Sequence, residues 1–125
     1  MNDGLIKDVL TLQLEVQDAY ADLAEKTRTA QAKASVLRAA REAWGLERIK
    51  ILIQYKDEPT ALGKNEQARE AVLRDKTLVE SEAHDTAAEV SLVANDAVQI
   101  AQLRVDSLRA QLRCYEVIAG LTEPK

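Results

Sequence analysis

The sequence predicts an all-α protein, an elongated, coiled-coil-like antiparallel helical hairpin with a short helix at its turn. Residues that favour helices dominate its 125 positions, which include no Phe, two Pro and four Gly. Apolar residues recur at helical spacing in two long stretches, on either side of residues 56–76. Strand-forming residues never gather into alternating runs bounded by turn residues, so a sheet has little to be built from.

The first stretch predicts one long helix over about residues 5–55. Its apolar residues fall at steps of seven, as in one seam of a coiled coil: Val9, Val16, Leu23, Ala30, Leu37, Trp44 and Ile51. A second seam begins at Leu5, Leu12 and Ala19, but lysines stand at the next two positions. There we expect either a contact face shifted to Thr27 and Ala34, or a local break near residues 27–29. Gly45 marks a bend or a close backbone approach.

The turn and a short helix are predicted over about residues 56–76. Pro59 ends the first long helix, because it disfavours helical geometry at the preceding residue. Gly63 permits a positive φ. Asn65 then caps a short helix from Glu66 to Arg74.

The second long helix is predicted over about residues 77–119, so the chain is read as one helical domain. Thr77 and Glu80 match a capping box, and Gly120 is a C-cap candidate. Its apolar stripe has an average spacing near 3.6, which predicts a straighter helix than a strict heptad. The stripe comprises Val79, Ala83, Thr86, Val90, Val93, Ala97, Ala101, Val105, Leu108, Leu112, Tyr115 and Ala119.

Charges favour an antiparallel pairing of the two long helices. A turn near residue 62 brings acidic and basic side chains of opposite helices together, which selects orientation more than it stabilises. The predicted groups are Glu15, Asp18 and Asp22 beside Arg113, Arg109 and Arg104, and Arg38 and Arg41 near Glu82, Asp85 and Glu89.

Apolar residues make up 46% of the chain and extend beyond a single seam on each helix. Those outside the seams are Ile49, Leu52, Ile53, Leu92, Val98 and Ile100. Such width predicts a homo-oligomer in which a second hairpin packs on the first, giving a four-helix dimer or a larger bundle.

Several functional classes are disfavoured by composition. The net charge is −4, and no segment has the basic excess of a duplex DNA-binding surface. Charged residues interrupt every apolar stretch well short of a membrane span, and no signal pattern opens the sequence. We therefore expect a cytoplasmic protein without membrane contact, in the host cytoplasm if a phage encodes it. The single cysteine, Cys114, is expected to fill the core.

Carboxylate arrays are the main catalytic alternative. Glu15, Asp18 and Asp22 share one helix face, as do Glu82, Asp85 and Glu89, and helical nucleotide pyrophosphatases bind magnesium with such spacing. Those enzymes also carry paired glutamates, which this chain lacks. Glu80 and His84 at i and i+4 form only a weak metal pattern. We predict no catalytic residues, no metal and no cofactor, and leave a metal-dependent pyrophosphohydrolase as the least favoured reading.

The turn is the predicted functional surface. Gly63-Lys64-Asn65 at a helix N-terminus presents backbone N–H groups and a cation to an anionic ligand, although solvated turn residues explain the same pattern. The candidate ligand- or partner-binding residues are Tyr55, Lys56, Lys64, Asn65, Arg69, Arg74 and Lys76.

The segment Gly63–Leu73, with Gly-Lys-Asn followed four residues later by Arg69, resembles a motif in small helical proteins of bacteriophages and prophages. There the motif joins two long helices. The resemblance implies a phage accessory protein linked to DNA metabolism, recombination or evasion of host defence. Together these observations predict a non-enzymatic interaction protein that binds a protein partner through the turn. Nucleic-acid or nucleotide binding at the same turn is the alternative.

Overall fold

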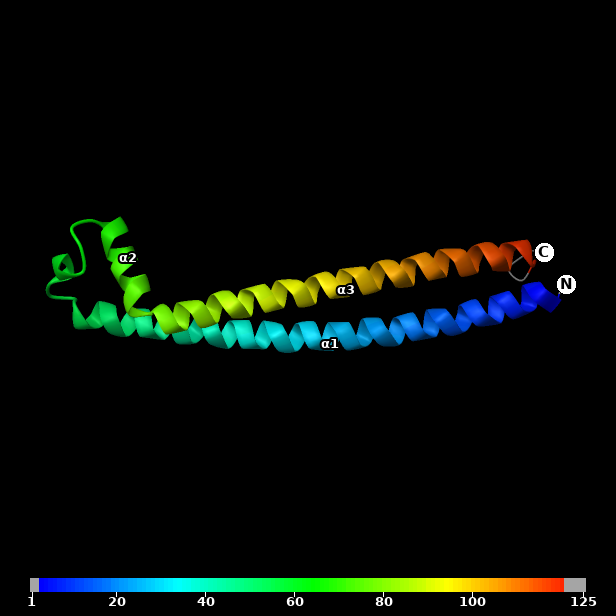
Figure 1. Ribbon diagram of the computed structural model, residues 1–125, viewed down its shortest axis with the longest axis horizontal. Helices are drawn as coiled ribbons and strands as arrows, with labels where there is room; N and C mark the ends of the chain where they lie inside the picture. The colour runs from blue at the N-terminus through cyan, green and yellow to red at the C-terminus, as the bar shows by residue number, and fades with distance from the viewer. Residues whose placement is uncertain (1–2, 121–125) are drawn as a thin grey trace. The chain divides into compact units, whose positions relative to one another are not determined.

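The computed structural model describes residues 3–120, which form three α-helices and one short 3-10 helix. These are α1 (Asp3–Gln54), η1 (Pro59–Ala61), α2 (Glu66–Lys76) and α3 (Leu78–Ile118). α1 and α3 pack antiparallel as a hairpin, and α2 belongs to the connection between them (Figure 1). The predicted fold class is confirmed.

The hairpin divides into two units, each made of one stretch of α1 and one stretch of α3. We call Met1–Ala30 with Ala94–Lys125 the terminal unit, and Gln31–Val93 the central unit. The connection and α2 belong to the central unit.

α1 is continuous through both places where a break or bend was considered. The Thr27 hydroxyl donates to the Leu23 carbonyl at 2.8 Å, which satisfies this polar side chain within its own helix. A Cβ added at Gly45 would meet nothing within 4 Å, so the expected close backbone approach is absent. All seven positions of the first α1 seam are buried or half-buried, as predicted. The second seam shifts to Thr27 and Ala34, and Lys33 is exposed.

The terminal unit is held by an apolar core. Leu12 and Ala19 of α1 pack with Val105 and Leu108 of α3, and Val105 is fully buried. Partly buried residues surround this cluster: Val16, Leu23, Leu112 and Tyr115. Burying each such Leu or Val contributes roughly 1.5–3 kcal/mol. The predicted stripe of the second long helix is therefore correct in its C-terminal half.

The same stripe is wrong in the central unit. There Ser81, Ala87 and Ser91 of α3 are buried, as is Thr77 just before it, and the predicted residues are exposed: Val79, Ala83, Thr86, Val90 and Val93. The contact face follows steps of seven, and the apolar stripe from Val79 to Ala97 alternates steps of four and three, so it keeps the same period on neighbouring positions of the helix. Consecutive steps of four, from Ala97 to Ala101 and from Ala101 to Val105, bring the stripe onto the contact face. The heptad positions are covered throughout: Thr77, His84, Ser91, Val98, Val105 and Leu112.

Two helix-end predictions also change. Gly63 does not adopt a positive φ; among residues 3–120 only Gly120 does, with φ 73°, next to the end of α3 as predicted. Thr77 lies between α2 and α3, and its hydroxyl donates to the Leu73 carbonyl at 2.7 Å. The hydroxyl oxygen accepts from the Trp44 Nε1, and among residues 3–120 no hydrogen bond joins Thr77 and Glu80, so the predicted capping box does not form.

Candidate interaction surfaces

The indole of Trp44 sits where α2 joins α3, and we call this place the Trp44 junction. Its Nε1 donates to the hydroxyl oxygen of Thr77 at 2.9 Å, and the His84 ring lies 5.0 Å from the indole, centroid to centroid. Thr77 in turn donates to the Leu73 carbonyl, and both Thr77 and Leu73 are buried. Hydrogen bonding thus ties α1 to the end of α2 through a single hydroxyl.

Arginine side chains surround the Trp44 junction. The guanidinium carbons of Arg48 and Arg74 lie 5.9 and 5.6 Å from the Trp44 ring centroid, within cation–π range. Arg48 binds Glu70 of α2 at 2.9 Å, and Arg74 binds Asp85 of α3 at 3.0 Å. The hydrogen bond from Arg48 lowers the pKa of Glu70, and the same bond raises the pKa of Arg48. These charges are engaged within the chain.

Most of the predicted binding residues of the turn also have partners in the chain. The Asn65 side chain accepts from the Ala68 N–H at 2.8 Å and caps α2, as predicted. Arg69 is half-buried, and its Nε donates to the Gly63 carbonyl at 3.0 Å. Arg74 belongs to the Trp44 junction.

Of the remaining predicted turn residues, Lys76 and Tyr55 contact each other, and the other two are exposed lysines. Lys76 Nζ lies 5.7 Å from the centroid of the Tyr55 ring. Lys56 and Lys64 are exposed, and neither forms an ion pair within the described part of the chain. The structure thus leaves two lysines of the predicted surface fully available to a partner.

Gly63 is required by packing against the first turn of α2. A Cβ at this position would lie 2.9 Å from the Ala68 Cβ and 2.9 Å from the Arg69 nitrogen. Real Cβ atoms do not approach backbone this closely. The glycine of the Gly-Lys-Asn motif therefore allows the connection to lie against α2.

The carboxylate arrays do not form the ion pairs between the long helices that the sequence predicts. Asp22 pairs with Lys26 of its own helix at 3.8 Å, and Asp85 pairs with Arg74. Across residues 3–120, none of the predicted ion pairs between the long helices forms, and no group of three or more His, Cys, Asp or Glu could hold a metal ion. Cys114 is exposed, contrary to its expected place in the core.

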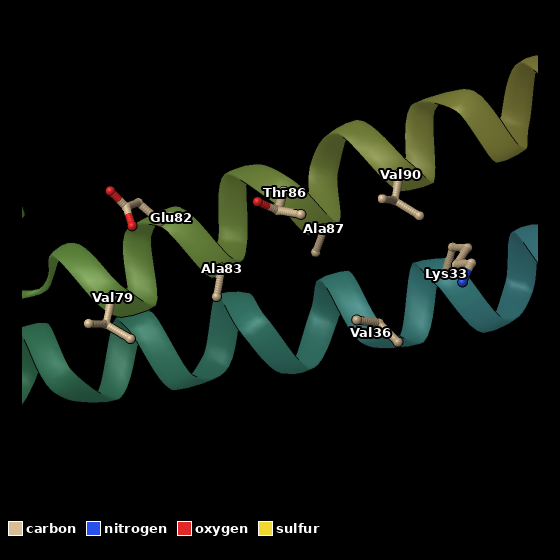
Figure 2. A pocket seen from close by; sticks show the side chains of 8 residues that line it. All are labelled: Lys33, Val36, Val79, Glu82, Ala83, Thr86, Ala87 and Val90. Carbon is tan, nitrogen blue, oxygen red and sulfur yellow. The ribbon is translucent and has the colours of Figure 1, made fainter.

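A groove of about 550 Å³ opens between α1 and α3 in the central unit (Figure 2). We call it the apolar groove, and its lining residues are Lys33, Val36, Val79, Glu82, Ala83, Thr86, Ala87 and Val90. A smaller hollow adjoins it at Glu89, Val90 and Val93. Sequence reasoning singled out most of these α3 residues, but assigned them to the seam of the hairpin.

The apolar residues along this groove are largely uncovered. Val36 is 58% exposed, Val79 76% and Val93 67%. Isolated exposed apolar residues are ordinary, but a contiguous row beside a groove marks a site where another surface packs. Of the other residues predicted outside the seams, five are exposed as well: Ile49, Leu52, Ile53, Leu92 and Ile100. Val98 was also predicted outside the seams, but it is half-buried at a heptad position of α3.

The chain matches no protein-family model, no curated protein and no solved structure. Within residues 3–120, no helix combines the length and the apolar character needed to cross a membrane.

Proposed function

We propose that this chain is a non-catalytic helical interaction protein that packs exposed apolar helix faces against helices of protein partners. One observation carries the proposal. In the central unit, α3 turns small and polar residues toward α1 and leaves its valines outside. Valines in a row at helical spacing are the surface that an amphipathic helix of another protein would cover.

Site-specific photo-crosslinking tests this proposal. A photoreactive phenylalanine analogue replaces Val93 in the full chain, expressed in cells that make its natural partners. Matched control chains carry the analogue at Ser35, which is exposed and absent from the groove lining. We expect protein adducts from position 93 and few from position 35. If no protein adduct forms at position 93, the proposed function fails.

The connection is a second place for partner contact. Lys56 and Lys64 are exposed and have no ion-pair partner among residues 3–120, so an acidic partner surface would find two available cations. The resemblance of Gly63–Leu73 to the phage motif supports a phage or prophage accessory role for this contact.

The second contact is tested with Lys56→Ala and Lys64→Ala together. Arg69 is left intact, because its bond to the Gly63 carbonyl holds the connection against α2. We expect weaker capture of the crosslinked partner with unchanged helicity by circular dichroism. Titration with a labelled oligonucleotide tests the alternative of nucleic-acid binding. If the unmodified chain binds the oligonucleotide tightly and the double variant does not, the partner of the connection is nucleic acid and not protein.

A further inference from the structure

We propose that a second copy of this chain occupies the apolar groove, with the two α3 helices antiparallel across a two-fold axis near Thr86. This inference rests on the proposed function and names its partner. It makes the same surface of both copies the interface, as expected for a two-fold dimer.

The spacing of the exposed stripe fits this symmetry. Val79, Ala83, Thr86, Val90 and Val93 follow steps of four, three, four and three, so Val79 and Val93 lie equally far from Thr86. A half-turn about Thr86 places Val79 of one copy against Val93 of the other, and Ala83 near Val90. Small residues then face large ones, which lets two helices interdigitate.

The charges at the rim of the groove fit the same arrangement. Lys33 lies beside Val90, and Glu82 lies near Val79 at the other end (Figure 2). Neither forms an ion pair within residues 3–120. An antiparallel second copy brings Lys33 of each chain to Glu82 of the other, twice in one dimer.

Charge complementarity also excludes the opposite orientation. A parallel second copy would place Lys33 against Lys33 and Glu82 against Glu82, and like charges across an interface are unfavourable. An unrelated helix would need both an acidic and a basic group at matching positions. The second copy supplies both without any further requirement.

Sedimentation equilibrium of the full chain gives the first test. We expect the unmodified protein to dimerise and Val90→Glu to be monomeric with unchanged helicity. Leu92→Glu is the matched control, because Leu92 is an exposed apolar residue of α3 outside the groove lining. That control should still dimerise. A monomeric unmodified protein, or equal effects of the two substitutions, would overturn the proposal.

Charge reversal tests the orientation. Lys33→Glu and Glu82→Lys should each weaken dimerisation at least about tenfold, because each creates two like-charge contacts. An equimolar mixture of these two variants should restore dimerisation, since both contacts in the mixed dimer again join opposite charges. If mixing restores nothing, Lys33 and Glu82 do not meet between copies and the antiparallel arrangement is wrong.

These outcomes are separable from failure of the proposed function. Photo-adducts from position 93 that contain only other proteins would remove the second copy and leave the interaction function standing. Absence of every protein adduct would remove both.

Discussion

The terminal and central units use the same two helices but opposite packing chemistry. In the terminal unit, large apolar residues such as Leu12 and Val105 fill the space between α1 and α3. In the central unit, that space is filled by Thr77 and by Ser81 and Ser91 of α3, and hydrogen bonds and ring contacts gather around Trp44. A hairpin can thus be closed by an apolar seam at one stretch and by small polar residues at another, which leaves apolar residues free on the outside.

The sharpest way to break this comparison is to truncate one seam residue in each unit. Leu12→Ala should lower the free energy of unfolding by about 2–5 kcal/mol, because it opens a cavity in an apolar core. Ser91→Ala should change it by less than about 0.5 kcal/mol, since the Ser91 hydroxyl makes no hydrogen bond among residues 3–120 and alanine favours helix. Chemical denaturation followed by circular dichroism measures both; equal losses would contradict the distinction between the seams.

Within the central unit, the two glycines should respond to alanine with opposite signs. Gly63→Ala should cost about 1–3 kcal/mol, because the new methyl group collides with Ala68 and the Arg69 nitrogen. Gly45→Ala should stabilise by up to about 1 kcal/mol, since it removes a helix-weakening glycine where nothing obstructs a Cβ. Thermal unfolding of both variants checks the signs. If Gly45→Ala lowered the stability instead, the helix would be constrained at position 45 by an interaction other than the packing described.

The smallest expected effect is a pH dependence of the Trp44 junction. The hydrogen bond from Arg48 lowers the pKa of Glu70 in the folded chain, so this pair stabilises above the ordinary glutamate pKa. That contribution is lost as the pH falls through the ordinary and then the lowered pKa of this carboxylate. It should amount to at most about 1 kcal/mol, because the pair is largely exposed and screened by solvent.

Glu70→Gln should therefore destabilise the protein slightly at neutral pH and reduce the loss on acidification from about pH 5 to pH 3. Glu25→Gln is the control, because Glu25 is an exposed helical glutamate without an ion pair among residues 3–120. Unfolding curves at several pH values measure the difference. Identical pH profiles for Glu70→Gln and the unmodified chain would show that the Arg48 contact does not persist in solution.

The fold was predictable because its signals are long and periodic. Seven apolar residues at steps of seven located the α1 seam, and Pro59 and Asn65 placed the connection. The seam that leads into α3 in the central unit was not predictable from hydropathy, because the residues at its positions Thr77, His84 and Ser91 are polar. Because Val79 and Val90 are apolar, the prediction placed the seam on the wrong face of α3. The only available signal was the step of seven itself.

The predicted site fared differently from the fold. Asn65 was correctly identified as a cap, since its role is set by the local chain. The contacts of Arg74 and Glu70 depend on Trp44, Asp85 and Arg48, which are distant in sequence, and local patterns carry no information about them. The sequence attributed the need for a glycine at position 63 to backbone freedom. The structure shows that Gly63 is needed because a Cβ there would lie too close to Ala68.

The change of spacing along α3 also fixes where a second surface can exist. From Val79 to Ala97 the apolar row alternates steps of four and three beside the heptad seam, and two steps of four then carry it onto the seam at Val105. The two lines are separate near Val79, and they merge by Val105, where a single residue belongs to both. After Val105, the residues of the apolar row are the seam residues themselves and pack within the hairpin. α3 therefore carries an outward-facing apolar row only before Val105, where the row joins the seam. A one-residue insertion that moves this joining point would lengthen the outward-facing row or remove it.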